Sequence, residues 1–294
     1  MTNSSFLSRI NKREVLIADG ATGTNLIARG LPGGETAELW VITQPEEIIQ
    51  LHKDFINAGA DLILTSTFSA TSIRLKNSTL KGRADEINRK AVKLARQAVG
   101  ALPVYIAGSI GPVGQLLKPY GPLETEEVIH AYTEQANAIT QEGADLLVIE
   151  TQFDLAEIKA AIQGVRQVSD IPLVVSLSYD RGRRTMMGVS PTQAAKELDD
   201  LPFDLFGINC GHSLEENLLN LVELRQLTTK PIWFKPNAGL PRIDSNGNTY
   251  YDINPNAMGA LAPSWLEAGA QVVGGCCGTS PEHLAAISRN VKMK

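Results

Sequence analysis

The feature that most constrains the fold of this chain is a short apolar segment that recurs along its whole length. Most copies are rich in Val, Ile and Leu and lack strict alternation, which is typical of parallel strands covered on both faces. The eight copies span 15–19, 61–67, 104–108, 145–150, 172–178, 204–209, 231–236 and 270–275. Amphipathic segments of helical length separate them, at 45–58, 85–99, 124–142, 153–168, 191–200, 214–228, 254–268 and 281–292.

Eight strand–helix units favour an α/β fold of the (β/α)8 TIM-barrel type, and 294 residues is a normal length for one such barrel. Because periodicity does not reveal whether a sheet closes, a doubly wound open sheet is the alternative. No linker-like stretch divides the chain, so we predict a single domain over residues 1–294. A glycine that ends a helix before a strand recurs at Gly59, Gly143 and Gly269, as expected for a unit reused around a ring.

Composition narrows the class of protein. The hydrophobic share of 43% and the charged share of 20% are those of an average globular protein. A net charge of −5, with no basic block longer than 181–184, argues against a nucleic-acid partner. We find no signal-peptide pattern or membrane-spanning apolar stretch, and three cysteines make no disulfide framework. We therefore expect no membrane partner and a cytoplasmic location.

The predicted strand ends carry the candidate functional residues, because chemistry in a (β/α)8 barrel lies at the C-terminal ends of the strands. In chain order these ends are Asp19, Thr67, Gly108, Glu150, Ser178, Cys210, Asn237 and the pair Cys276–Cys277. All three cysteines of the chain therefore fall on one predicted rim.

Three interpretations of the cysteines compete. They could be small buried hydrophobic residues, Cys276 and Cys277 could form a strained redox-active disulfide, or all three could bind one zinc ion with its fourth position open. Zinc is favoured, because the strands that precede Cys210 and the pair are near neighbours on a closed ring. The glycines of 274–278 allow the backbone angles that adjacent ligands need. The N-terminus of the helix expected from Pro281 also favours anionic sulfur.

A zinc ion held by three thiolates suits one kind of chemistry. The thiolates offset the charge of the metal, so the site activates water poorly but holds a fourth thiolate well. A free alkyl thiol is only a few per cent ionised at neutral pH, and it would bind deprotonated and stay nucleophilic. The pattern therefore predicts S-alkylation of a small thiol.

Two stretches resemble the zinc signature of the homocysteine S-methyltransferase family: "GINC" at 207–210 and "GGCCGT" at 274–279. Within the family, the chain is most similar to the homocysteine-binding module of cobalamin-dependent methionine synthase, which has "EPNAG" where this chain has "KPNAG". The other matching stretches are "LIADGATGT" (16–24), "AGADLILTSTF" (58–68), "GSIGP" (108–112), "IET" (149–151) and "KPNAG" (235–239).

The resemblance implies a zinc-dependent barrel that transfers a methyl group to homocysteine and forms methionine. Cys210, Cys276 and Cys277 would be the zinc ligands. Asp19 and Glu150 match the carboxylates that hold the amino group of the substrate, a geometry that fixes its orientation.

The resemblance also implies further contacts with the substrate. Thr67 and Phe68 match the segment that forms a wall of the substrate site. Backbone N–H groups of the segment that contains Gly108 and Ser109 would bind the substrate carboxylate. Asn209 lies beside a predicted zinc ligand and would orient it.

The methyl donor is less constrained. The betaine-using branch encloses a quaternary ammonium in aromatic side chains through cation–π attraction. This chain has Thr36, Ser69 and Thr151 at those positions, which disfavours betaine. The sequence contains no folate-binding or corrinoid-binding segment, so we expect a methyl-corrinoid on a separate protein or a small sulfonium such as S-methylmethionine.

Two other functions remain open at this point. One is a non-catalytic subunit that binds homocysteine or zinc within a methyl-transfer complex, and the other is a thiol-redox protein that uses the vicinal cysteines. The inserts at 179–188 and 238–252 could be lids or docking edges, although solvated loops are the simpler interpretation. Asn246–Gly247 predicts a hairpin turn within the second insert.

Overall fold

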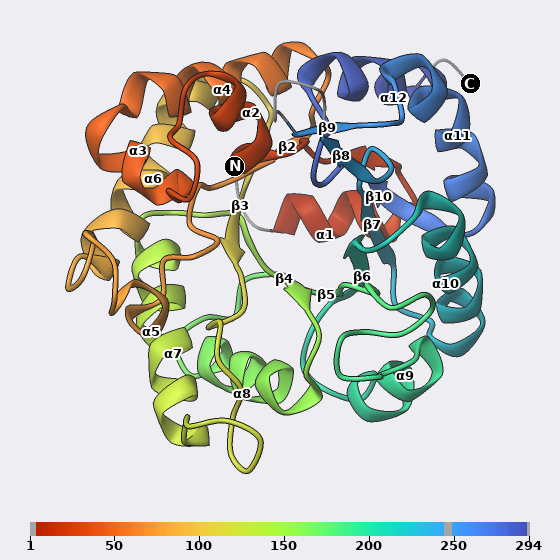
Figure 1. The fold of residues 1–294 in the computed structure, drawn as a ribbon. Helices are drawn as coiled ribbons and strands as arrows, with labels where there is room; N and C mark the ends of the chain where they lie inside the picture. The colour runs from red at the N-terminus through yellow and green to blue at the C-terminus, as the bar shows by residue number, and fades with distance from the viewer. Residues whose placement is uncertain (1–3, 244–248, 293–294) are drawn as a thin grey trace.

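The computed structural model describes residues 4–243 and 249–292 and contains a ring of eight parallel strands (Figure 1). The strands are β1 (Leu16–Ile17), β2 (Leu62–Leu64), β3 (Tyr105–Ile110), β4 (Leu146–Gln152), β5 (Leu173–Leu177), β6 (Leu205–Cys210), β7 (Ile232–Pro236) and β10 (Ala270–Val273). Their spatial order is β1-β10-β7-β6-β5-β4-β3-β2. A parallel bridge between Ala18 and Leu62 joins the two ends of this order. The sheet is therefore closed, the predicted (β/α)8 barrel is confirmed, and the open-sheet alternative is wrong.

Each predicted helix is present around the ring. They are α4 (Pro45–Asn57), α6 (Ala84–Val99), α7 (Thr125–Gln141), α8 (Leu155–Arg166), α9 (Pro191–Leu198), α10 (Leu214–Leu227), α11 (Pro255–Glu267) and α12 (Pro281–Lys292). The glycines predicted to end helices have positive φ angles of 102° at Gly59, 87° at Gly143 and 101° at Gly269. A residue with a Cβ would be strained in this conformation, so the recurring glycine has a backbone cause.

Four short helices were not predicted from the sequence: α1 (Ser4–Asn11), α2 (Thr22–Ala28), α3 (Ala37–Thr43) and α5 (Ser72–Leu75). Their lengths of four to eight residues give about two turns or fewer, too little for a periodic signal. In Figure 1, α1 lies across the centre of the ring. Phe6 and Ile10 of this helix are buried in the cluster that fills the barrel interior.

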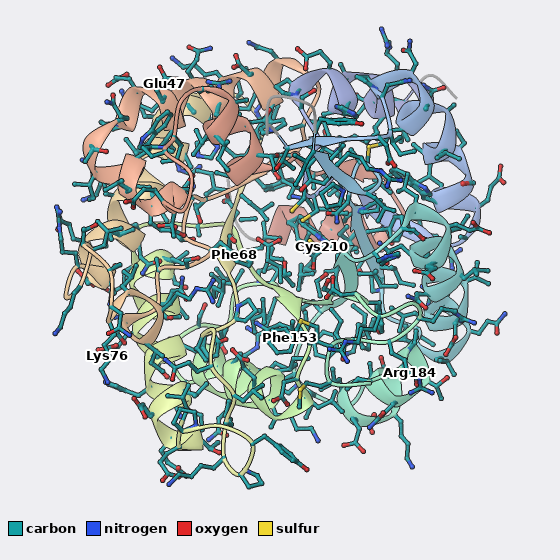
Figure 2. All side chains as sticks on the ribbon, viewed as in Figure 1. Glu47, Phe68, Lys76, Phe153, Arg184 and Cys210 are labelled. Atoms are coloured by element: carbon teal, nitrogen blue, oxygen red, sulfur yellow. The ribbon has the colours of Figure 1, made fainter. Side chains whose placement is uncertain are left out.

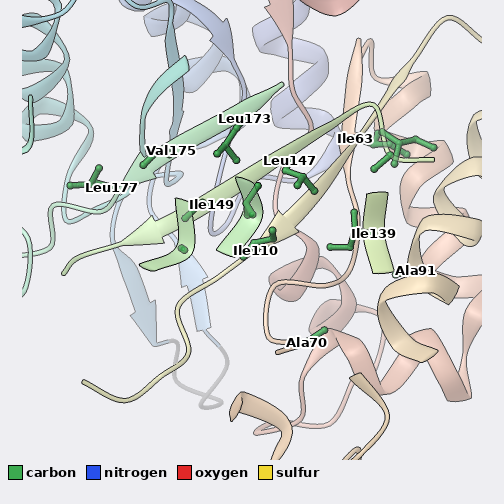
Figure 3. Close-up of a cluster of buried hydrophobic side chains, with 14 of the residues drawn as sticks. Ile63, Ala70, Ala91, Ile110, Ile139, Leu147, Ile149, Leu173, Val175 and Leu177 are labelled. Atoms are coloured by element: carbon green, nitrogen blue, oxygen red, sulfur yellow. The ribbon is translucent and has the colours of Figure 1, made fainter. Parts of the chain in front are cut away.

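Side chains alternate between two buried layers along each strand, because successive strand residues point to opposite faces. On β4, Leu146 and Val148 belong to the cluster inside the barrel, and Leu147 and Ile149 belong to the layer beneath the helices. Figure 3 shows this outer layer, with Leu147 and Ile149 among the labelled side chains. The same parity directs the next residue, Glu150, into the barrel at its C-terminal end.

The second predicted insert contains an antiparallel hairpin of β8 (Pro241–Ile243) and β9 (Thr249–Tyr251). The predicted turn residues Asn246–Gly247 lie outside the described residues. In the first insert, an isolated antiparallel bridge pairs Arg181 with Arg184. Among the helices of the described ranges, we find none with the length and apolar character needed to cross a membrane.

Candidate metal and substrate site

The three cysteines meet at the C-terminal rim of the barrel. Cys210 ends β6, whereas Cys276 and Cys277 follow β10, and the three sulfur atoms lie within 4.8 Å of one another. The Sγ atoms of Cys210 and Cys277 are 3.8 Å apart. Ligand atoms at ~2.3 Å from a tetrahedral zinc ion are about 3.8 Å from each other. The donor set and this spacing therefore fit a zinc ion with three thiolate ligands.

The side chain of Asn237 joins the two loops that carry the cysteines. Its Oδ1 accepts a hydrogen bond from the N–H of Cys277 at 3.0 Å, and its Nδ2 donates to the carbonyl oxygen of Gly211 at 2.9 Å. Cys210 itself has a φ of 61°, a conformation that residues with a Cβ seldom adopt. Such strain persists only where the surroundings impose it, so the fold holds the cysteine loops in one arrangement.

The protonation states of the cysteines are linked. Hydrogen bonds from Cys210 and Cys276 lower the pKa of Cys277 to about 3. Hydrogen bonding to Cys276 and Cys277 raises the pKa of Cys210 well above its ordinary value. The lowered pKa favours the thiolate form of Cys277, and a thiolate attracts a cation to the site.

The hairpin reaches this cluster through Tyr251. Its ring packs against Gly278, and its hydroxyl interacts with Cys277. Burial and the negative charge of Cys277 both raise the pKa of Tyr251. The described part of the 238–252 insert thus contacts the cysteine cluster and is not simply a solvated loop.

A cavity of about 410 Å³ opens beside the cysteines. Its lining combines the rim of the barrel with residues of α2 and of the segment that leads into α3. In Figure 2, the labelled Phe68 and Cys210 lie near the centre of the ring, while Glu47 and Arg184 lie at its periphery. Of the predicted site residues, six line the cavity: Phe68, Ser109, Glu150, Cys210, Cys276 and Cys277. Asp19, Thr67, Gly108 and Asn209 are absent from the described lining.

Glu150 is a buried acid that is linked to the cysteine cluster through the side chain of Asn209. Its Oε1 accepts from the hydroxyl of Ser109 at 2.5 Å, and its Oε2 lies 3.5 Å from Nδ2 of Asn209. That same Nδ2 lies 3.7 Å from the sulfur of Cys276. Burial raises the pKa of Glu150 to about 7, against the opposing effect of Lys235. Asn209 therefore connects the carboxyl group to the cysteine cluster.

Asp19 is 1% exposed and is absent from the described lining of the cavity. Its Oδ1 accepts from Nζ of Lys235 at 2.6 Å, and its Oδ2 accepts from the N–H of Leu64 at 2.7 Å. Both oxygens are thus engaged within the protein. Burial lowers the pKa of Lys235, but the charges of Asp19 and Glu150 outweigh it and raise the pKa overall, so the ammonium stays protonated.

Thr67 and Gly108 lie behind the cavity wall. Thr67 is fully buried, and its hydroxyl donates to the carbonyl oxygen of Ser109 at 2.6 Å. Gly108 has the outward parity of its strand, since a Cβ there would collide with Ile139 and Leu147. The substrate contacts that the resemblance implies for these two residues stay predictions.

Sequence reasoning missed three charged residues of the cavity wall: Lys235, Glu35 and Glu38. Glu38 is 2% exposed and accepts a hydrogen bond from the N–H of Ser69 at 2.6 Å. Burial raises its pKa. The inward parity of Lys235, two residues after the interior Trp233, was the signal that could have found it.

The fold and the site define a (β/α)8 barrel protein with a thiol cluster that fits a metal at its C-terminal rim. A family model described as homocysteine S-methyltransferase matches residues 16–291. The chain therefore belongs to the homocysteine S-methyltransferase family.

Two curated relatives are methionine synthases. The protein from Mycobacterium tuberculosis is 31% identical over 301 residues, which cover 95% of this chain and 25% of that protein. The protein from Mycobacterium leprae is also 31% identical, over 298 residues, covering 95% of this chain and 24% of its own length. The chain thus spans about a quarter of the length of these relatives.

Solved structures support the same fold. The metallated form of the homocysteine methyltransferase MmuM from Escherichia coli is 27% identical, with a TM-score of 0.80 over 96% of this chain and 98% of that chain. The oxidised form of MmuM gives a TM-score of 0.79 at 27% identity, over 95% and 96% of the two chains.

Proposed function

We propose that this chain is a zinc-dependent methyltransferase that transfers a methyl group to the thiol of homocysteine and forms methionine. The observation that carries the proposal is the cluster of Cys210, Cys276 and Cys277, whose sulfur atoms lie within 4.8 Å of one another at the edge of the cavity. The family of the chain and the names of its relatives point to the same reaction.

The three cysteines would hold the zinc ion, which supplies a deprotonated substrate thiol at neutral pH. Glu150 would accept hydrogen bonds from the ammonium of homocysteine, with Ser109 and Asn209 keeping the carboxyl group in position. Phe68 would pack against the methylene groups of the substrate from the cavity wall. The substrate sulfur forms the new S–C bond, the donor leaves with the electron pair, and the thiol proton passes to solvent.

The cavity wall also bears on the methyl donor. Thr36, Ser69 and Thr151 all line the cavity, and Phe68 is the one aromatic residue among the described lining. An aromatic box for a quaternary ammonium needs several rings around the cation, so this wall disfavours betaine. Two donors are compatible with it: a small sulfonium such as S-methylmethionine, and a methyl-corrinoid on a separate protein. We also propose a cytoplasmic location, because three free thiols persist in a reducing compartment.

Metal analysis tests the zinc site. Purified protein should contain about one zinc ion per chain, measured by mass spectrometry of the metal. Cys277→Ser should lose zinc but keep its far-ultraviolet circular dichroism, because the side chain lies on the rim. Ser69→Ala is the matched control, since it changes the same cavity without removing a sulfur. Absence of zinc from the wild-type protein would favour the thiol-redox alternative.

A panel of donors tests the reaction. Zinc-loaded protein is incubated with homocysteine and, in turn, S-methylmethionine, methylcobalamin and betaine, and methionine is measured by mass spectrometry. We expect methionine with one of the first two donors and none with betaine. If zinc and homocysteine bind but no donor yields methionine, the proposal is wrong and the non-catalytic subunit is favoured.

A further inference from the structure

Lys235 is the one cation among the described residues that line the cavity. Its side chain is 3% exposed, and the charged residues that share the described lining with it are the acids Glu35, Glu38 and Glu150 beside the three cysteines. A buried ion pair contributes little to stability, because the desolvation of its charges offsets their attraction. The placement of Lys235 at a cavity wall therefore calls for a role other than stability.

Lys235 donates a hydrogen bond to one of the two acids that the resemblance assigns to the ammonium of the substrate. The resemblance implies that Asp19 and Glu150 face that ammonium together, and in the structure Asp19 accepts from Nζ of Lys235 at 2.6 Å. The second oxygen of Asp19 accepts from the N–H of Leu64. Each oxygen of Asp19 thus has a partner within the protein, and Asp19 is 1% exposed and absent from the described cavity lining.

The ammonium of Lys235 has N–H donors that are not used within the described part of the protein. It carries three N–H donors, and the bond to Asp19 is its one hydrogen bond among the described residues. Lys235 lies on β7 and is in register with Asn209 on the neighbouring strand β6. Asn209 in turn contacts Glu150. The cavity thus places a cation and an acid on adjoining parts of its wall, a pattern that complements a zwitterion.

The carboxylate of an amino-acid substrate needs a partner in this cavity. The backbone donors that the sequence suggested are engaged within the protein: the N–H of Ser109 donates to Oγ1 of Thr65 at 3.1 Å, and the N–H of Gly111 donates to the carbonyl oxygen of Phe68 at 2.9 Å. An unpaired carboxylate among the acids of the wall would be repelled and poorly solvated. Among the charged side chains of the described lining, Lys235 is the one that attracts a carboxylate.

We propose that Lys235 binds the carboxylate of the amino-acid substrate and determines specificity for it. Asp19 holds Lys235 in position and does not contact the substrate, and Glu150 alone receives the substrate ammonium. The inference rests on the proposed function, because it assumes that the thiol substrate is an α-amino acid.

Binding of three thiols to zinc-loaded protein tests the inference by isothermal titration calorimetry. L-Homocysteine carries both groups, 4-sulfanylbutanoic acid lacks the ammonium, and 3-aminopropane-1-thiol lacks the carboxylate. The variant is the double change Asp19→Asn with Lys235→Met, which removes the pair together and leaves no unpaired buried charge. Thermal melting of the variant verifies that the barrel is folded.

The double variant should bind homocysteine and 4-sulfanylbutanoic acid about 10-fold to 100-fold more weakly, as expected for loss of a charge-assisted hydrogen bond. Its affinity for 3-aminopropane-1-thiol should stay within about threefold, the scatter allowed by context. Glu150→Gln should give the opposite pattern, with weakened binding of homocysteine and the aminothiol and retained binding of 4-sulfanylbutanoic acid.

Two results separate the inference from the proposed function. If wild-type protein binds homocysteine and the double variant weakens the aminothiol equally, or weakens neither thiol, the role of Lys235 is refuted while the proposed function stands. If zinc-loaded wild-type protein binds none of the three thiols, the proposed function fails and the inference fails with it.

Discussion

The buried carboxyl group of Glu150 makes the stability of this protein depend on pH in a direction opposite to that of a surface acid. Glu150 is 7% exposed, and burial raises its pKa from 4.5 to about 7. The perturbation is Glu150→Gln, which keeps the shape of the side chain but removes its titration. The metal-free, substrate-free protein is the state for which this pKa holds.

The size of the stability difference follows from the pKa shift of Glu150. Raising the pKa from 4.5 to about 7 is worth about 3 kcal/mol, at ~1.36 kcal/mol for each pKa unit. Because the folded state binds the proton more tightly, the contribution of Glu150 to stability is full below pH 4.5 and is lost as the pH rises through about 7. Glutamine has no charge to bury. The variant should therefore match the wild type near pH 4 and exceed it by about 3 kcal/mol at pH 8.

The assay is thermal melting of both proteins from pH 4 to pH 8 with a chelator present. For a chain of 294 residues, about 3 kcal/mol corresponds to a difference of about 5 °C in Tm at pH 8. Glu46→Gln, a change of one exposed acid in α4, controls for the loss of a surface charge. Parallel Tm curves for the wild type and Glu150→Gln over this range would refute the reasoning.

Two further substitutions test the loops that carry the cysteines and the packing of α1 in the barrel interior. Asn237→Ala removes both hydrogen bonds between the cysteine loops, so zinc affinity measured by chelator competition should fall about 10-fold to 100-fold with the fold kept. An unchanged affinity would mean that the backbone alone sets the loops. Phe6→Ala empties a fully buried site beside Tyr105 and should lower the free energy of unfolding in urea by about 3–5 kcal/mol. A loss below about 1 kcal/mol would exclude α1 from the barrel core.

The barrel was predictable because its strands are buried on both faces. Segments such as 145–150 and 172–178 carry Val, Ile and Leu at consecutive positions, and helices of 12 to 17 residues such as α7 and α8 give several turns of periodic signal. The short helix α1 was missed because its eight residues resemble a polar N-terminal segment. This helix buries Phe6 and Ile10 in the barrel interior, a site that exists only after the ring of strands has closed.

The cysteine site was predictable for a similar reason. Once the strand ends are known, a closed ring brings Cys210 and the pair Cys276–Cys277 to the same rim, whatever the side-chain details. Whether a strand-end residue faces the barrel interior or the helices depends on strand parity, which was harder to predict from the sequence. Gly108 shares the outward parity of Ile106 and Ile110, so it faces the helices although it ends a predicted strand.

The ion pair between Asp19 and Lys235 could not be read from any local pattern, because the two residues are 216 positions apart. Resemblance to the family places a carboxylate at position 19, but it does not say which cation that carboxylate faces. The "KPNAG" stretch supplies the lysine at position 235, and in this chain that lysine is the partner of Asp19.

The lysine at position 235 affects which substrates the cavity can accept. A cavity with Glu150, unpaired Asp19 and the thiolates would carry only negative charge near the substrate and would favour an amine without a carboxylate. Lys235 neutralises Asp19 and still has N–H donors to offer, so the same wall accepts both ends of an amino acid. Selectivity for a zwitterionic thiol over a simple aminothiol is therefore the property that Lys235 should confer, and a protein of this family with an acid in its place would need another donor for the carboxylate.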